Sequence, residues 1–180
     1  MSTFKLQAGA TFPKVTVPLL DSKNQVDLGT PNKGYDWKLV VVYRGKHCPI
    51  CTNYLRELND VLPRLNLLDI DVIAVSADSI ERAKTQMEIV KPMFPVAYDL
   101  SIEQMQQLGL YISHPRSAHE SDRPFPEPGL YVINEEGKVQ LVDIANAPFL
   151  RPSLNRLAAG LSFIRTPENN YPIRGTFEKV

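Results

Sequence analysis

Cysteine is scarce in this sequence, with only two among its 180 residues. A secreted domain held together by disulfides would carry more cysteines, spread along the chain. Charge of one sign is not in excess either, because twenty lysines and arginines balance twenty aspartates and glutamates. This balance argues against nucleic acid or an anionic membrane as the main partner.

Long hydrophobic runs are also missing. The longest, around residues 39–43, is far too short to span a bilayer. The first ten residues lack the apolar core that a signal peptide needs, so we expect a cytoplasmic protein. No glycine-rich nucleotide motif accompanies the first predicted central strand, and Gly45 alone is not one, so we expect no organic cofactor.

What the sequence does contain is the composition of an ordinary globular domain, with 43% hydrophobic and 22% charged residues. A chain of this length can bury one core without disulfide or metal staples. No internal repeat, low-complexity tract or linker is visible. We therefore expect a single domain over residues 1–180, with its core at about residues 6–164 and a polar tail at 166–180.

Two apolar runs rich in β-branched residues, at 38–43 and 71–77, are typical of strands buried on both faces of a parallel sheet. Leucines at helical spacing between residues 55 and 65 predict a helix after the first run, and Pro63 is expected to kink or end it. Asp78 and Glu81 have the spacing of a capping box and predict the start of a second helix.

Hairpins and shorter elements frame this core. They are an N-terminal hairpin at 15–20 and 26–28, a short strand at 96–98, a capping box at Ser101 and Gln104, a hairpin at 129–134 and 139–144, and a helix opened by Pro152. Residues 113–128 are predicted to form a loop. The order predicts an α/β fold with a central mixed β-sheet flanked by helices and an N-terminal β-hairpin extension.

The two cysteines stand three positions apart, between the first buried strand and its helix. Pro49 suits the first helical position, which puts Cys48 at or next to the N-cap. Unpaired N–H groups and the positive end of the helix dipole favour a thiolate there, as would Lys46 or a protonated His47. Cys51 lies about one turn further in, within reach of a disulfide. We expect Cys48 to be the nucleophile and Cys51 its resolving partner.

Two other interpretations of the cysteine pair stay open. Two buried structural thiols would give the same composition. A zinc site would need further ligands, and His114 and His119 have a spacing that zinc sites use. More than sixty residues separate Cys51 from His114, however, where compact zinc fingers use about 12 to 15. We expect no bound metal and treat both histidines as loop residues.

Beyond the cysteines, several stretches resemble the thioredoxin superfamily and, within it, peroxiredoxin-like proteins of the AhpC/TSA group, named after alkyl hydroperoxide reductase and thiol-specific antioxidant. The stretches are residues 6–13, 42–45 with 48–51, 75–79, and 130–134 with 136–138. The resemblance implies a thioredoxin-like fold and an antioxidant oxidoreductase that reduces peroxides or disulfides. It also implies a thioredoxin-like or low-molecular-weight thiol as reductant and is compatible with a homodimer.

The resemblance implies a chemical cycle for this pair. The Cys48 thiolate attacks a peroxide and becomes a sulfenic acid, Cys51 condenses with it to a disulfide, and an external thiol reduces that disulfide. One alternative is a thiol-disulfide oxidoreductase without peroxidase activity. A second is a non-catalytic thioredoxin-fold binding module or zinc-binding protein.

Two features depart from the peroxiredoxin pattern P-x-x-x-T-x-x-C. Counted back from Cys51, Cys48 takes the threonine position and Arg44 the proline position, so peroxiredoxin spacing favours Cys51 as nucleophile while thioredoxin spacing favours Cys48. The arginine that peroxiredoxins place before their late strand is absent, and Pro128 there resembles the cis-proline turn of thioredoxins. We expect the bond before Pro128 to be cis and to lie opposite the cysteines, and Arg44 or Arg123 to orient the substrate.

Overall fold

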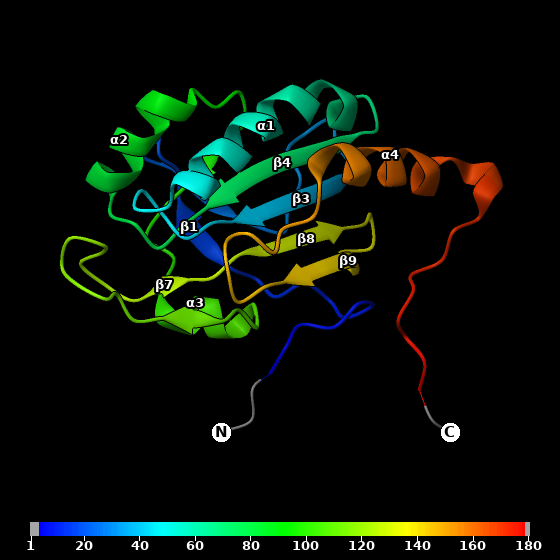
Figure 1. Ribbon diagram of the computed structural model, residues 1–180. Helices are drawn as coiled ribbons and strands as arrows, with labels where there is room; N and C mark the ends of the chain where they lie inside the picture. The colour runs from blue at the N-terminus through cyan, green and yellow to red at the C-terminus, as the bar shows by residue number, and fades with distance from the viewer. Residues whose placement is uncertain (1–3, 179–180) are drawn as a thin grey trace.

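A computed structural model describes residues 4–178, so the outermost residues of the predicted domain and tail lie outside it. A five-stranded mixed sheet forms its centre (Figure 1), in the order β5-β4-β3-β8-β9. Its strands are β3 (Trp37–Val42), β4 (Ile70–Val75), β5 (Val96–Ala97), β8 (Gly129–Ile133) and β9 (Val139–Ile144). Strands β3, β4 and β5 run parallel, while β8 runs antiparallel to β3 and β9. The predicted α/β class and mixed sheet are confirmed.

Two layers cover the sheet, as Figure 1 shows. One contains α1 (Pro49–Asn66), α2 (Ile80–Val90) and α4 (Leu154–Arg165), and the other contains the hairpin of β1 (Thr16–Pro18) and β2 (Gln25–Asp27) with α3 (Ile102–Gln107). Within β3, Leu39 and Val41 pack under the first layer and Val40 and Val42 under the second, and all four are fully buried. Burial on both faces explains why this strand is apolar at every one of these positions.

Helix α1 confirms the predicted leucine face but not an end at Pro63. The helix continues for three residues beyond this proline, to Asn66. Leu62 and Leu65, on either side of Pro63, are 6% and 1% exposed. Their burial offsets the hydrogen bond that the proline removes, because packing of an apolar face supplies most helix stability in proteins. Among residues 4–178, no helix is both long and apolar enough to cross a membrane.

Helix starts were predicted with mixed success. The capping box of Ser101 and Gln104 is present at α3. At α2 the prediction was wrong by one residue, because the Ser79 side chain is the N-cap and accepts from the Arg82 amide at 3.4 Å. At α4 the N-cap is Ser153, so the helix begins after Pro152 rather than with it.

The predicted loop at 113–128 is not wholly irregular. It ends in β7 (Phe125–Pro126), which pairs with β6 (Ile112–Ser113), and a short 3₁₀ helix, η1 (Pro167–Asn169), follows α4. Strands of two residues are too short to show an alternating pattern, so the sequence gives no signal for them.

The register of the sheet determines which segments meet at the carboxyl end of its parallel strands. Val42, the last residue of β3, pairs with Gly129, the first of β8, and parallel β4 ends at Val75 beside it. The cysteine loop after β3, the residues after β4 and the segment before β8 therefore come together at one end of the sheet. Open α/β sheets place their ligand sites at this carboxyl end of the parallel strands.

Candidate active site

Cys48 lies at the start of α1, as predicted. It is the N-cap, with Pro49 as the first helical residue, and the Cys51 amide donates to the Cys48 Sγ at 3.2 Å. The two cysteines form a disulfide with their Cα atoms 5.2 Å apart. Their exposed fractions are 2% and 1%. The predicted pairing and the predicted place of Cys48 at the helix terminus are confirmed.

Three polar residues spaced four apart, Asp78, Arg82 and Gln86, support the loop before Cys48 through hydrogen bonds and an ion pair. The Asp78 Oδ2 accepts from the Lys46 amide at 2.7 Å, and its Oδ1 pairs with the Arg82 Nε at 3.0 Å. The Gln86 Nε2 donates to the Gly45 carbonyl at 3.2 Å. The sequence does show the spacing of 78, 82 and 86, but Asp78 was assigned to helix capping, so this supporting role was missed.

Gly45 is the point of closest approach in this loop. Its φ is +130°, and a Cβ there would lie 2.7 Å from the Asp78 Oδ2. We expect Gly45→Ala to be destabilised beyond the roughly 1–2 kcal/mol that a positive φ alone costs, and to lose about tenfold or more in thiol reactivity through displacement of Cys48.

Gly137→Ala is the matched control, because Gly137 also has a positive φ, +73°, but no atom would lie within 4 Å of the new Cβ. Urea unfolding and the rate of alkylation of the reduced protein would measure both effects. Equal losses in the two variants would contradict the importance of the Asp78 contact.

Arg44 is held by an ion pair rather than being free to meet a substrate with its full charge. Its Nε lies 3.0 Å from the Glu127 Oε2, and its guanidinium stacks 4.9 Å above the Phe125 ring. Glu127 also accepts from the Ser113 hydroxyl at 2.6 Å. The ring of His47 packs on the same Phe125, with centroids 4.4 Å apart. Glu127 and Phe125 were both missed as site residues.

A cavity of about 410 Å³ adjoins this cluster. It is lined by Arg44, Ser113, His114, Arg116, Glu120, Phe125, Pro148 and Phe149. The lining combines aromatic rings with cations and a carboxylate, and Phe149 is 73% exposed at its rim. The cavity shares Arg44 and Phe125 with the cluster beside His47 and so provides space for an organic group near the cysteine loop.

Arg123 does not join the cysteine loop. It pairs with Asp99 at 2.9 Å and with Asp122 at 3.1 Å, and its remaining polar contact is to the Ala77 carbonyl. These carboxylates occupy its guanidinium near the surface. Of the two arginines predicted to orient a substrate, the structure therefore places only Arg44 beside the cysteine motif.

The expectation of a cis bond before Pro128 is wrong, since no cis peptide bond occurs among residues 4–178. The chain runs extended from β7 into β8, with both sides of this bond fixed by hydrogen bonds. The Glu127 amide donates to the Tyr111 carbonyl at 2.8 Å, and the Pro128 carbonyl accepts from the Ala145 amide at 3.0 Å. A trans bond satisfies both contacts, so nothing offsets the cost of the cis form.

Arg151 is a further cation at the end of the sheet that carries the cysteine loop, and it was not predicted. Its guanidinium donates to the Val42 and Gly129 carbonyls and stacks 4.7 Å above Tyr54, one turn after Cys51 on α1. None of the ion pairs found among residues 4–178 includes it. Burial lowers the pKa of Arg151 to about 10. Nothing in its local sequence signals this position, because residues far apart in the chain create it.

The zinc interpretation finds no ligand set in the described part of the chain. No group of three or more His, Cys, Asp or Glu side chains there could hold a metal ion. His114 lines the cavity beside Arg44, while the two cysteines are bonded to each other.

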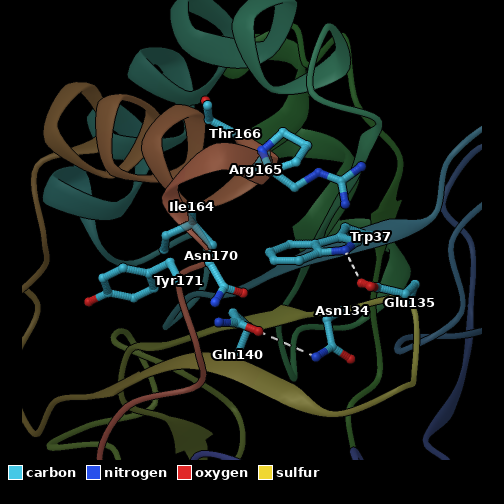
Figure 2. A pocket seen from close by; sticks show the side chains of 10 residues that line it. Trp37, Asn134, Glu135, Gln140, Ile164, Arg165, Thr166, Asn170 and Tyr171 are labelled. Atoms are coloured by element: carbon cyan, nitrogen blue, oxygen red, sulfur yellow. Dashed lines mark hydrogen bonds between the residues drawn. The ribbon is translucent and has the colours of Figure 1, made fainter.

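A second cavity, of about 280 Å³, lies at the opposite end of the sheet (Figure 2). Trp37 forms one wall and donates from its indole to Glu135 at 2.5 Å, while Asn134 donates to Gln140 at 3.3 Å (Figure 2). Trp37 is the first residue of β3 and Val42 is the last. The length of this strand, about 17 Å, therefore separates the cavity from the end of the sheet that carries the cysteine loop. It takes no part in the thiol site.

Comparison with solved structures places the fold among peroxiredoxins. The chain is similar to Peroxiredoxin 6 of Arenicola marina, with a TM-score of 0.75 and 15% identity over 91% of this chain and 75% of that one. It is also similar to a peroxiredoxin-like protein from Aquifex aeolicus, with a TM-score of 0.71 and 19% identity over 88% of both chains. Peroxidoxin BcpB from Mycobacterium tuberculosis gives 0.71 and 16%, over 89% of this chain and 99% of that one. The predicted thioredoxin-like fold is thereby confirmed.

A search of curated protein sequences gave no significant match. A sequence profile of the AhpC/TSA family, however, matches residues 8–142, which is most of the chain and includes both cysteines. The family and the bonded cysteine pair support a thiol peroxidase or thiol-disulfide oxidoreductase. With the fold and the profile in agreement, the chain belongs to the AhpC/TSA family.

Proposed function

We propose that this protein reduces peroxides through the Cys48 thiolate, with Cys51 as the resolving thiol and an external thiol as reductant. The observation that carries the proposal is the position of Cys48 as N-cap of α1, with its sulfur 3.2 Å from the Cys51 amide. An N–H donor and the positive end of the helix dipole both stabilise a thiolate over a thiol. Cys51 lies further in, as the third residue of α1.

The proposed cycle balances in three steps. The Cys48 thiolate attacks the O–O bond of ROOH, forming Cys48–SOH and, after one proton is taken up, ROH. The Cys51 thiol then condenses with the sulfenic acid, forming the disulfide and releasing water. Two donor thiols finally reduce the disulfide to two cysteine thiols and are themselves oxidised to a disulfide.

Two cations beside the cysteines are suited to the first step. Arg44 borders the cavity and Arg151 binds the carbonyls at the ends of β3 and β8. Preorganised donors stabilise the negative charge that develops on the departing oxygen as the O–O bond breaks. Pro128, the residue before β8, stays a proposed contributor to substrate orientation. Arg123 is the weaker candidate because its guanidinium contacts Asp99, Asp122 and the Ala77 carbonyl rather than the cysteine loop.

The test is consumption of hydrogen peroxide by the purified protein with thioredoxin and its reductase. An organic hydroperoxide serves as second substrate, because the cavity beside Arg44 has room for an organic group. Turnover with either peroxide that stops when the donor thiol is omitted supports the proposal. Reduction of disulfides with no turnover of either peroxide would favour the thiol-disulfide oxidoreductase instead.

The helix terminus also predicts the acidity of Cys48. In reduced protein the pKa of Cys48 is expected to lie below the free value of about 8.5. The pH dependence of alkylation, measured in Cys51→Ser so that one thiol reacts, gives this value directly. A pKa at or above the free value would remove the physical reason for assigning Cys48 as nucleophile.

A further inference from the structure

His47, next to Cys48, has no partner for either ring nitrogen within the described residues. Both nitrogens are shielded from solvent, and the ring packs on Phe125 at 4.4 Å with an interplanar angle of 58°. A neutral imidazole has one donor and one acceptor, and buried groups of this kind are normally hydrogen-bonded. In the disulfide form an unsatisfied titratable group therefore directly precedes Cys48 in the chain.

Charged groups of both signs face the His47 ring. From its own loop come Arg44 and the exposed Lys46, from the α2 side Asp78 and Arg82, and from the segment before β7 Glu120, with Glu127 behind Arg44. Burial lowers the pKa of His47 most, Arg44 lowers it further, and Asp78 and Glu120 oppose this. In the disulfide form His47 is therefore neutral at neutral pH.

We propose that His47 takes up a proton when the Cys48–Cys51 disulfide is reduced and releases it when Cys48 is oxidised. The inference rests on the proposed thiolate at Cys48. On reduction, two donor thiols supply two electrons and two protons, and one proton goes to Cys51 and the other to His47, leaving a Cys48 thiolate beside an imidazolium. On oxidation by peroxide, His47 releases its proton to solvent and the departing alkoxide takes up one proton from solvent, so protons balance. His47 is a positioning residue in this scheme, because it acts through the charge of Cys48.

The position of His47 supports this coupling. His47 directly precedes Cys48, with Cα atoms about 3.8 Å apart, and its ring is shielded from solvent against Phe125. Because the ring nitrogens are shielded from solvent, a negative charge formed on the adjacent Cys48 favours the protonated imidazole and so raises the pKa of His47. Linkage is reciprocal, so a protonated His47 lowers the pKa of Cys48 by the same amount.

Proton NMR of the wild-type protein tests this, since the chain has only three histidines. Ring resonances would be followed from about pH 5 to 8.5, in the oxidised protein and after reduction confirmed by a thiol count. The pKa of His47, assigned by the resonance lost in His47→Gln, is expected to rise by about one unit on reduction. His114 and His119, both exposed, are internal controls and should not move. An unchanged His47 titration overturns the proposal.

Reciprocity supplies a second readout. In Cys51→Ser, replacing His47 by Gln should raise the pKa of Cys48 by the same roughly one unit, seen as a shifted alkylation profile. A shift at His47 without one at Cys48 would also overturn the proposal. Neither measurement uses peroxide, so both shifts without peroxide turnover would support the role of His47 while contradicting the peroxidase assignment.

Discussion

Treatment of Cys51→Ser with peroxide is expected to trap Cys48 as a sulfenic acid, and excess peroxide should drive it to the sulfinic acid. The reason is that removal of the resolving thiol leaves the oxidised sulfur with no partner for condensation. Intact-mass measurement would show the gain of one and then two oxygen atoms. A dimedone adduct would identify the first product as the sulfenic acid.

Cys48→Ser is the complementary variant, and its expected loss of peroxide turnover is at least about a thousandfold, because the nucleophile itself is removed. Cys51 should stay largely unreacted at the same dose, since it lacks the helix-terminus position of Cys48. If Cys51 becomes the residue that over-oxidises in Cys48→Ser, the peroxiredoxin spacing identifies the nucleophile and the two roles are reversed.

A pure disulfide reductase would give a different pattern. Cys51→Ser would then accumulate a mixed disulfide between Cys48 and the substrate, because the buried thiol that completes the exchange is gone. Its Cys48 would react with peroxide no faster than a free thiol. The two variants therefore separate a thiol peroxidase from a thiol-disulfide oxidoreductase.

The parts of the site that the sequence predicted are those set by local chain geometry. The place of Cys48 follows from an apolar strand, a short loop and Pro49, all within about a dozen residues. A proline at the first helical position and a capping residue before it leave few alternatives. The hairpin of β8 and β9 was likewise predicted, because its two strand-forming runs and the turn between them are adjacent in sequence.

The parts that were missed depend on contacts across the sheet. Arg151 reaches Val42, which lies more than one hundred residues earlier in the chain, and Gln86 reaches Gly45 from the neighbouring helix. No local pattern marks such a pair. The cis prediction at Pro128 failed for the same reason, since its geometry is set by the Tyr111 and Ala145 backbone groups on neighbouring segments.

A buried ion pair on the face of β3 that carries Val40 and Val42 should have a large effect on stability. The Lys38 Nζ lies 2.6 Å from the Asp71 Oδ2 on neighbouring strands, and Lys38 is 1% exposed. Burial lowers the pKa of Lys38, while the hydrogen bond and charge of Asp71 oppose that shift. Asp71 also accepts from the Asn32 amide at 2.8 Å, so the pair ties the segment before β3 to the sheet.

Asp71→Asn is expected to lower the free energy of unfolding by about 3–5 kcal/mol at neutral pH, because it leaves an uncompensated buried ammonium. The loss should shrink as pH rises toward about 10.4, the pKa of lysine in the unfolded state. Between the lowered pKa of folded Lys38 and this value, the lysine binds a proton in the unfolded state but not in the folded state, so stability rises with pH. Urea unfolding at several pH values measures both. Glu136→Gln is the control, since its pair with Lys138 is exposed and should change stability by less than about 1 kcal/mol.

The double variant Lys38→Met with Asp71→Leu shows whether the unpaired charge or the packing of these side chains causes the stability loss in Asp71→Asn. Replacing both partners by apolar side chains removes the buried charge and its desolvation cost together. We expect it to recover most of the stability lost in Asp71→Asn, with some loss remaining because the Asn32 amide no longer has its acceptor. A double variant no more stable than Asp71→Asn would show that the pair is needed for the register of β3 against β4, since Lys38 and Asp71 are direct partners in that ladder.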